Sequence, residues 1–438
     1  MARKWTIDDD DEDHGRLNGA DDFPEPDEAP PSFDDAGFAR RPARLPLALV
    51  LAASIVGAIF AATSTADFAA HLDRQVHAIH CSVMPGAEAQ TGDSGCRTVM
   101  LSPYSSWFRD SYWGGIPVSM LALAVFCFLA YRSAHLVWRG RPLRSETGFL
   151  FAATGLPALM SIVYGYLAAT AVGALCTVCA GIYVTSGLCF VGALAALLMS
   201  ERPPVGDETA LRRFGVGVLE GCGFVLALTL VWMAFIPQPK AGERGAEGCG
   251  TLVAPEDPAG ILIDLARTPS GAPSIELLDP LCPACRAFDA RLQASQLGPR
   301  LDQQAVLFPL DSTCNWMVTT SLHPGACAVA EAMLCAPGQT EARRILEWAF
   351  THQERLLEEA KADEERLRGH IKAEFPSVAS CLGTPVAKNK LVKSLRWAVA
   401  NALPVMTPQL FVRGRRLCDE DTDLGLEYTL SRMIGGAR

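Results

Sequence analysis

The stretch Leu175-Cys176-Thr177-Val178-Cys179-Ala180 places two cysteines three residues apart inside a long apolar sequence. No charged residue occurs between Glu146 and Glu201, and one membrane crossing needs only about 20 helical residues. The span therefore predicts a helical hairpin, with its turn at Thr170-Ala171-Val172-Gly173 and the cysteines at the start of its second helix. Two thiols one helical turn apart can close a disulfide, so a redox pair is favoured over two packed cysteines.

The arginines on either side of this hairpin predict its orientation. Arg139, Arg141 and Arg144 precede it, and Arg202, Arg212 and Arg213 follow it. Positive residues mark cytoplasmic ends, so the turn and the Cys-x-x-C should face the opposite side.

Three further apolar runs predict three more crossings. They extend from Leu45 to about Ala66, from Trp113 to Tyr131 and from Val216 to Ile236. Five spans place the N-terminus inside and the C-terminus outside. The first two spans are joined by an external loop that carries Cys81 and Cys96. A cleaved signal peptide is not expected, because the first apolar run begins only after Arg44.

Composition supports a membrane protein with a soluble part. Hydrophobic residues make up 50% of the 438 residues. Residues 1–40 hold 13 acidic and 4 basic side chains, which is −9 of the total charge of −10, and they predict a disordered acidic cytoplasmic tail. No basic patch indicates a nucleic-acid partner. Fifteen cysteines, most of them in segments predicted to be external, indicate an oxidising compartment.

Residues 249–438 have the composition of a soluble domain. Ser274–Leu278 reads as a buried strand, and the sequence Asp279-Pro280-Leu281-Cys282-Pro283-Ala284-Cys285 turns from it into a helix. Pro283 suits the first helical turn, where a missing N–H costs nothing. Cys282 then lies at a helix N-terminus, where the helix dipole lowers the pKa of a thiol.

The rest of this domain predicts an α/β fold with a helical insertion. A second strand is expected at 305–308, and a mostly helical stretch at 326–402 contains a charged, solvent-facing part at 341–370. The later elements are the pair Thr407-Pro408, strands at 409–413 and 416–418, and a final helix at 421–434.

The membrane half resembles the vitamin K epoxide reductase (VKOR) family in its bacterial form, over about residues 45–200. The matching residues are the loop pair Cys81 and Cys96, Ser102, Gly115-Ile116-Pro117, the Cys176–Cys179 motif and Tyr183. The resemblance implies a four-helix transmembrane domain at 41–203 around a quinone (ubiquinone or menaquinone), followed by a fifth transmembrane helix and linker at 204–248.

The same resemblance implies roles for individual residues. Cys176 and Cys179 would act at the quinone, and Cys81 and Cys96 would relay electrons to them. Ser102 and Tyr183 would line the quinone pocket. The family can carry an Asn on the second helix that hydrogen-bonds the quinone; this chain has none there, and Ser119 is the expected substitute.

The soluble half resembles the thioredoxin superfamily. The matching residues are Cys282-Pro283-Ala284-Cys285 and Thr407-Pro408, which looks like the cis-proline of that superfamily. The helical insertion is similar to that of the DsbA-like branch. Fusion of the two kinds of domain is a known bacterial arrangement, so the two resemblances support each other.

Several cysteines and histidines have alternative interpretations. Cys81 and Cys96 could be only a structural staple, and Cys282 and Cys285 could be zinc ligands, although a lone Cys-x-x-C supplies two ligands of the usual four. His77 and His80 are expected to line the polar face of a loop helix, and no metal site is predicted. Cys127, Cys189 and Cys222 read as packing residues inside spans. Six external cysteines remain whose pairing the sequence does not choose, although proximity favours Cys314 with Cys327: Cys249, Cys314, Cys327, Cys335, Cys381 and Cys418.

These observations predict a quinone-linked thiol–disulfide oxidoreductase of the bacterial inner membrane. Its soluble domain would be periplasmic, and its partners would be reduced secreted or periplasmic proteins and the quinone pool. Electrons would pass from Cys282 and Cys285 to the loop pair and then to the membrane pair. One alternative is a reductase of quinone or quinone epoxide that uses thiols as donors. Another is a non-enzymatic membrane redox sensor.

Overall fold

The structure is a computed structural model, and it describes residues 43–72, 81, 95–140, 142–200, 209–235, 249–295 and 297–435. Three features of the sequence lie outside these ranges: the acidic tail, the histidines at 77 and 80, and the linker at 236–248.

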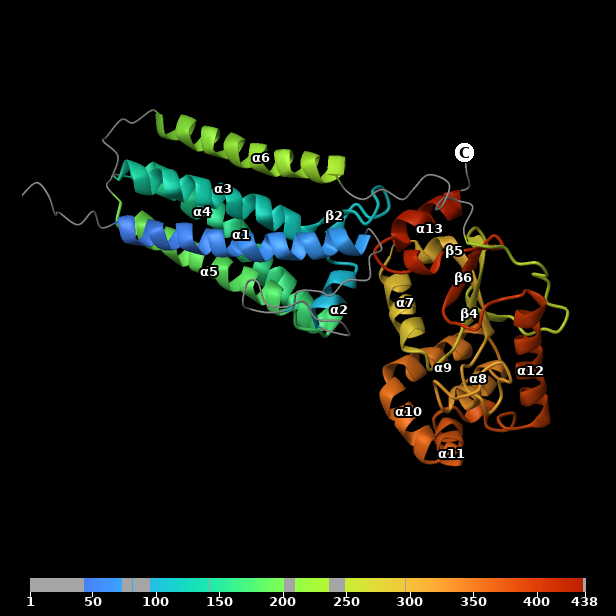
Figure 1. The fold of residues 1–438 in the computed structure, drawn as a ribbon. Helices are drawn as coiled ribbons and strands as arrows, with labels where there is room; N and C mark the ends of the chain where they lie inside the picture. Colours follow the sequence, from blue (N-terminus) through green and yellow to red (C-terminus); the bar gives the residue numbers. More distant parts are fainter. Residues whose placement is uncertain are drawn as a thin grey trace, which may run out of the picture. The chain divides into compact units, whose positions relative to one another are not determined.

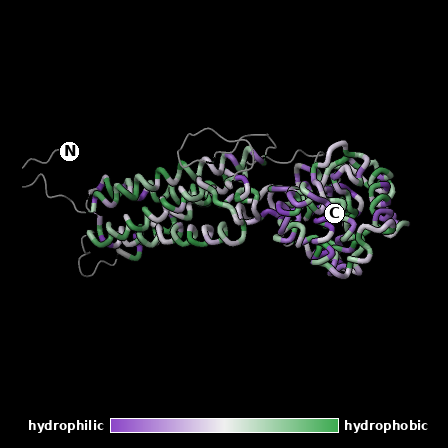
Figure 2. The backbone as a smooth tube through the Cα atoms, turned by 90° about the horizontal axis from the view of Figure 1, so that it is seen from below, coloured by the Kyte–Doolittle hydropathy of each residue, from purple (hydrophilic) through white to green (hydrophobic). Residues whose placement is uncertain are grey.

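Among the described residues, five helices are long and apolar enough to cross a membrane, as predicted. Hydrophobic residues dominate along them (Figure 2). These helices are α1 (Arg44–Leu72), α3 (Val118–Arg139), α4 (Arg144–Leu167), α5 (Thr177–Leu198) and α6 (Thr209–Phe235).

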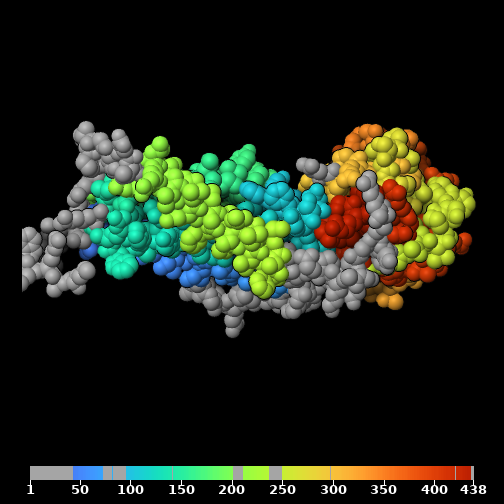
Figure 3. All heavy atoms as spheres, turned by 90° about the horizontal axis from the view of Figure 1, so that it is seen from above, coloured from blue at the N-terminus to red at the C-terminus, as the bar shows by residue number. Residues whose placement is uncertain are grey.

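The five helices form a bundle. Helix α1 packs against α3 and α5, α4 packs against α5, and α6 lies along α3 and α4 (Figures 1 and 3). Phe126 and Leu129 of α3 are fully buried in the bundle core. On α6, in contrast, Leu219 and Phe235 are 73% and 81% exposed, as expected of side chains that face lipid.

The hairpin turn lies where the sequence places it. Helix α4 continues as a single π-helical turn, η1 (Ala168–Val172), and Gly173 then adopts a left-handed conformation with φ of 69°. Glycine reaches this region without the steric cost of a side chain, so the helix ends here. Helix α5 begins four residues later, directly after Cys176.

The second span begins later than predicted. Helix α3 starts at Val118 rather than at Trp113. Gly114 and Gly115 both have positive φ, and strand β2 (Ile116–Pro117) pairs antiparallel with β1 (Ser106–Trp107) before the helix can begin. The first span is longer than predicted, because α1 continues beyond Ala66 to Leu72.

The C-terminal domain contains a five-stranded sheet in the order β3-β5-β4-β6-β7. Strands β4 and β5 are parallel and are joined by α7 (Pro283–Ala294), whereas β3, β6 and β7 each pair antiparallel with a neighbour. A parallel unit extended by a hairpin in this order is the thioredoxin-like arrangement. The strands are β3 (Ile263–Ala266), β4 (Ala272–Leu278), β5 (Leu301–Leu307), β6 (Gln409–Val412) and β7 (Arg415–Arg416).

Five helices form the insertion between β5 and β6, and α13 (Leu426–Gly435) follows the sheet (Figure 1). The segment 341–370 is only partly solvent-facing, because Ile345, Leu356 and Leu367 are buried in the core of the domain. Helix α13 starts at Leu426 rather than at 421, after a 3-10 turn at Asp419–Asp421. The insertion helices are α8 (Ala326–Leu334), α9 (Gln339–Thr351), α10 (Gln353–Ala362), α11 (Glu364–Glu374) and α12 (Pro385–Ala400).

Three disulfides join the six remaining cysteines of the C-terminal domain. Cys314–Cys327 is the pair that proximity favours, and this prediction is confirmed. The other two bonds are Cys249–Cys418 and Cys335–Cys381.

Candidate functional site

The membrane Cys-x-x-C opens helix α5. Cys176 is the N-cap residue, and its Sγ accepts a hydrogen bond of 3.1 Å from the backbone N–H of Cys179. The two sulfurs form a disulfide. A cysteine N-cap followed by a cysteine at the third helical position brings both sulfurs to the same end of the helix, where a disulfide can join them.

The loop pair Cys81–Cys96 is also a disulfide, and it lies against the membrane pair. The Oγ1 of Thr177, the residue after Cys176, is 3.5 Å from Cys81 Sγ and 3.6 Å from Cys96 Sγ. The two disulfides are thus separated by one side chain. This is the proximity that thiol–disulfide exchange requires.

Gly95 makes this approach possible. A Cβ atom at Gly95 would overlap the carbonyl oxygen of Leu175, the residue before the membrane pair. The backbone before Cys96 therefore touches the backbone before Cys176. Only glycine permits this contact without moving one of the two segments.

A partly open cavity of about 380 Å³ lies within the bundle beside these cysteines. Cys96, Cys176 and Cys179 all contribute to its wall. Most of the remaining wall is apolar, with Phe68 and Ile182 among its side chains. The volume is within the range of about 300–1,000 Å³ typical of small-molecule sites.

Polar side chains interrupt this apolar wall at a few points. Ser102, Ser119 and Tyr183, the three residues expected to contact a quinone, all line the cavity. Ser119 Oγ accepts a hydrogen bond of 3.0 Å from Thr65 Oγ1. Cys179 and Tyr183 are four residues apart on α5 and so share one face of the helix.

Sequence reasoning missed several polar residues of the cavity, among them Tyr164 on α4 and Asp67 on α1. The Tyr164 hydroxyl oxygen accepts a hydrogen bond of 3.2 Å from Trp107 Nε1, which leaves its own O–H available to donate. Asp67 is the only acidic residue of α1 and is 6% exposed. The signal that could have found both is a polar side chain within an apolar span.

The donors on the wall suit a quinone. A quinone ring is apolar and planar and carries two carbonyl oxygens, which accept hydrogen bonds and donate none. Hydroxyl groups from Tyr164 and Tyr183 on an otherwise apolar wall supply donors of the required kind, whereas the Ser102 hydroxyl donates to the carbonyl oxygen of Val99 at 2.7 Å.

The second Cys-x-x-C opens helix α7 in the soluble domain. Cys282 is the N-cap residue after β4 and the turn that follows it, and Pro283 occupies the first helical turn. Both thiols are free; Cys282 is 5% exposed and Cys285 is fully buried. The Thr407–Pro408 peptide bond is cis, and the Thr407 carbonyl oxygen lies 3.6 Å from Cys282 Sγ.

The two thiols of this pair differ in pKa. The hydrogen bond from the Cys285 thiol lowers the pKa of Cys282, and the hydrogen bond with Thr407 lowers it further. Burial raises it, and the pKa of Cys282 is about 6. Burial raises the pKa of Cys285 well above its ordinary value, and the negative charge of Cys282 raises it further. At neutral pH Cys282 is therefore the thiolate and Cys285 the thiol, which makes Cys282 the attacking sulfur.

Glu276 of β4 is a third titratable group of this site, and it was not singled out from the sequence. Burial raises its pKa, and the charge of Asp289 raises it further, to about 8. Its Oε2 accepts a hydrogen bond of 2.9 Å from Gln303 Nε2. Its negative charge also raises the pKa of Cys285, so the two groups are coupled. The available signal was a charged residue within a buried strand.

The remaining cysteines are single thiols within the bundle. Cys189 is buried, in agreement with a packing role, and its Sγ lies 3.4 Å from Ser54 Oγ. Cys222 on α6 was also expected to be packed, but it is exposed. No group of three or more potential metal ligands occurs in the described ranges, and the histidines at 77 and 80 lie outside them.

Comparisons with known proteins agree with this arrangement. Residues 48–194 match the sequence profile of the Vitamin K epoxide reductase family. A search of curated proteins found no match.

Two solved structures resemble part of the chain weakly. The crystal structure of Wolbachia pipientis alpha-DsbA1 has 16% identity and a TM-score of 0.28, covering 36% of this chain and 76% of its own. That of the oxidoreductase DsbA from Xylella fastidiosa has 17% identity and a TM-score of 0.28, covering 40% and 92%.

The C-terminal domain has a thioredoxin-like fold, as its strand order, its Cys-x-x-C at the start of α7 and its cis-proline indicate. The matched family and the paired cysteines of the bundle indicate a membrane thiol–disulfide oxidoreductase. Residues 48–194 are thus a domain of the vitamin K epoxide reductase family, which this chain joins to a thioredoxin-like domain.

Proposed function

We propose that this protein is a quinone-linked oxidase that makes disulfide bonds in proteins outside the cytoplasm. The observation that carries the proposal is the contact of Thr177 with both sulfurs of the loop disulfide, beside a cavity whose wall includes Cys96, Cys176 and Cys179. This geometry supports transfer between the two pairs. It gives the loop cysteines a purpose beyond that of a structural staple.

The soluble pair begins the reaction in its oxidised form. A substrate thiolate attacks Cys282 Sγ and breaks the Cys282–Cys285 bond, and the electron pair goes to Cys285, which takes up a proton. A second substrate thiolate then attacks the mixed disulfide, and Cys282 leaves as a thiolate. The substrate is oxidised by two electrons, and the soluble pair is reduced by two.

The loop pair receives these electrons next. The Cys282 thiolate attacks Cys81 and breaks the Cys81–Cys96 bond, and Cys285 resolves the mixed disulfide. Cys96 then attacks Cys176, with which it shares the cavity wall, and breaks the Cys176–Cys179 bond, so that Cys179 leaves and takes up a proton. Cys81 resolves the Cys96–Cys176 mixed disulfide, which restores the loop disulfide and leaves the membrane pair reduced. Each step exchanges one disulfide for another, so none needs an external oxidant until Cys176 and Cys179 are reduced.

The cavity residues serve the last step. A quinone bound there supplies an acceptor for two electrons and two protons. Ser102, Ser119 and Tyr183 would hold its oxygens by hydrogen bonds, and the apolar wall would exclude water from the thiols. Cys179 faces the same side of α5 as Tyr183, so we assign it to the quinone side of the pair.

The proposed division of the chain follows from this scheme. Residues 1–40 form an acidic cytoplasmic tail, 41–203 the four-helix domain, 204–248 the fifth helix and linker, and 249–438 the periplasmic domain. The membrane is the bacterial inner membrane, with the N-terminus in the cytoplasm. The substrates are reduced secreted or periplasmic proteins, and tethering gives the soluble domain an effective concentration of about a millimolar at the loop pair.

The test is anaerobic mixing of the fully reduced protein, in lipid nanodiscs, with ubiquinone and menaquinone analogues. The proposal expects a loss of quinone absorbance and, with a dithiol peptide present, one peptide disulfide for each quinone reduced. A redox sensor would give no turnover. If the protein is a quinone or epoxide reductase, its Cys282→Ser variant should reduce quinone with a small dithiol at the same rate as the natural protein. If it is the proposed oxidase, the Cys282→Ser variant should no longer oxidise the peptide.

A further inference from the structure

A buried carboxylate organises the turn before Cys282. Asp279 directly follows β4 and is fully buried. Its Oδ1 accepts the N–H of Leu281 at 2.8 Å, and its Oδ2 accepts the N–H of Leu310 at 2.7 Å. The same Oδ2 lies 2.7 Å from Nδ1 of His323. One side chain therefore connects the active-site turn, the segment after β5 and a histidine 44 residues away.

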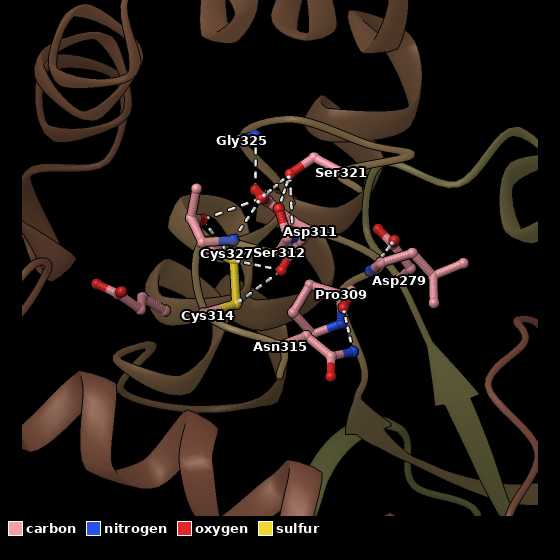
Figure 4. Close-up of a disulfide and its surroundings, with 12 residues drawn as sticks. Asp279, Pro309, Asp311, Ser312, Cys314, Asn315, Ser321, Gly325 and Cys327 are labelled. Atoms are coloured by element: carbon pink, nitrogen blue, oxygen red, sulfur yellow. Dashed lines mark hydrogen bonds between the residues drawn. A yellow bond between two sulfur atoms is a disulfide. The ribbon is translucent and has the colours of Figure 1, made fainter. Parts of the chain in front are cut away.

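His323 is held by a loop with little freedom. The disulfide Cys314–Cys327 closes the loop, and the buried carboxylate of Asp311 accepts hydrogen bonds from Gly325 N at 2.9 Å and Ser321 Oγ at 2.8 Å (Figure 4). The backbone N–H of His323 donates to Leu310 O at 3.2 Å. The imidazole is thus anchored by both its backbone and its ring, and it is 14% exposed.

The charges around His323 favour its protonated form. The groups that face it are Asp279 at the end of β4, Asp311 in the loop after β5 and Cys282 at the start of α7. Burial by itself lowers the pKa of His323, but the hydrogen bond and charge of Asp279, with the charges of Cys282 and Asp311, raise it above its ordinary value. The ionic contact with Asp279, 2.7 Å long, and the charge of Cys282 therefore favour the imidazolium form of His323.

The motif itself supplies no such charge. The two residues between Cys282 and Cys285 are Pro283 and Ala284, and neither is charged. Asp279 alone would oppose the Cys282 thiolate, because its negative charge raises the pKa of that thiol. A cation bound to Asp279 offsets the negative charge of that carboxylate, and so opposes its effect on the Cys282 thiolate.

We propose that His323, held as an imidazolium by Asp279, is a positioning residue that stabilises the Cys282 thiolate and so makes the soluble pair a stronger oxidant. This rests on the proposed function of that pair as the oxidant of substrate thiols. His323 keeps its proton throughout the reaction. When the pair is reduced, one proton stays on Cys285, the other is released, and the electron pair on Cys282 is stabilised by the adjacent positive charge.

The test measures the reactivity of Cys282 directly in the full-length reduced protein. The rate of alkylation of Cys282 by iodoacetamide is followed by peptide mass spectrometry between pH 4 and 9. His323→Gln keeps a donor for Asp279 but loses the charge, and we expect the midpoint of the rate profile to rise by roughly 0.5–1 pH unit. At pH 7 the equilibrium of the pair with glutathione should shift about three- to fivefold toward the disulfide.

Two further variants separate charge from structure. His323→Lys keeps a positive charge and should leave the midpoint close to that of the natural protein, even if His323→Gln does not fold. His370→Gln is the matched control, because His370 Nδ1 lies 3.2 Å from Glu359 Oε2 in a second histidine–carboxylate pair of the same domain. Replacing His370 should leave the midpoint of the Cys282 alkylation profile unchanged.

The inference is overturned if His323→Gln leaves the midpoint unchanged, or if His323→Lys raises it as much as His323→Gln does. Neither measurement needs a quinone or the membrane cysteines. Failure here would therefore leave the quinone link standing, and a failed quinone assay would leave these titrations interpretable.

Discussion

The two Cys-x-x-C pairs use the same local backbone in different surroundings. Cys176 and Cys282 are both N-cap residues, and each partner cysteine lies one turn inside the helix. The membrane pair is closed as a disulfide and faces an apolar cavity. The soluble pair is open, and ionisable groups act on it from the sheet and the loops: Glu276, Asp279 and His323.

This difference separates what the motif supplies from what its neighbours supply. The spacing brings two sulfurs together at a helix end in both domains. Polar and charged neighbours then set the stability of the Cys282 thiolate, whereas the wall of the cavity sets what can reach Cys179. The same four-residue motif can therefore serve as the first and the last pair of one electron path.

The largest expected effect concerns the membrane pair. Cys179→Ala should lower quinone reduction about a thousandfold or more, even when the soluble domain is supplied fully reduced, because it removes the sulfur assigned to the quinone side. Quinone absorbance under anaerobic conditions is the measurement. Cys189→Ala, a buried cysteine of the same helix, should retain activity within about twofold. Turnover by Cys179→Ala would place the quinone-reducing sulfur elsewhere.

The second prediction connects the two pairs. Cys285→Ser combined with Cys96→Ser removes the resolving sulfur on each side. The Cys176–Cys179 disulfide should then take the two electrons released as Cys282 and Cys81 join, and the transfer should stop as a Cys282–Cys81 bond within one chain. A protease site inserted beside Arg244 allows the halves to be cut apart. They should stay joined until a reductant is added, and mass spectrometry should find the Cys282–Cys81 peptide. Halves that separate without reductant would contradict the proposed order of transfer.

The third prediction uses the buried acid of the soluble pair. The pKa of Glu276 in the folded domain is about 8, above its ordinary value of 4.5. Between these values the unfolded chain releases a proton that the folded chain retains, so stability falls as pH rises through this window. Glu276→Gln accepts the same hydrogen bond from Gln303 and should remove this dependence, gaining about 2–4 kcal/mol at pH 8 relative to pH 5.

Pulse proteolysis of the reduced full-length protein in urea, at pH 5 and pH 8, measures this difference through the fraction of intact C-terminal domain. Glu347→Gln is the control: Glu347 is 56% exposed and pairs with Arg343, and its removal should change the difference by less than about 1 kcal/mol. Equal pH dependence in the natural protein and Glu276→Gln would show that Glu276 is ionised in the folded state.

The smallest expected effect tests the contact between the loop and the membrane pair. Gly95→Ala places a methyl group against the carbonyl oxygen of Leu175, so the Cys81–Cys96 pair should move away from Thr177. We expect about a tenfold slower transfer from the loop pair, or about 1.4 kcal/mol in activation free energy. Stopped-flow quinone absorbance measures it. Gly187→Ala has open space for its methyl group and serves as the control; identical rates for the two variants would argue against the contact.

Much of the membrane half could be predicted because its physical signals are local. The absence of charge between Glu146 and Glu201 requires two helices, and Gly173 marks where the chain can turn. The boundary near Trp113 was wrong because an apolar aromatic residue resembles the start of a span. The glycines and the short ladder that follow it delay the helix to Val118.

The polar groups around each sulfur were harder to predict. The charge of Glu276 reaches Cys285 only because the sheet brings their two segments together. In the same way, His323 pairs with Asp279 only because the insertion folds back onto the sheet. Tyr164 lines the cavity from α4, and only its polarity within an apolar span marks it in the sequence. Motif spacing locates sulfur atoms, but tertiary packing decides which acids, bases and donors surround them.

The connectivity of the three structural disulfides has a consequence for how a newly synthesised chain folds. Cys314–Cys327 and Cys335–Cys381 are both nested within Cys249–Cys418. A chain that crosses a membrane N-terminus first presents its cysteines in sequence order, and joining them as they arrive would link Cys249 to Cys282 and Cys285 to Cys314. Such an order forms none of the native bonds and consumes both active thiols. The three native bonds therefore require a new chain to fold before its cysteines are joined, or require wrong bonds to be rearranged afterwards.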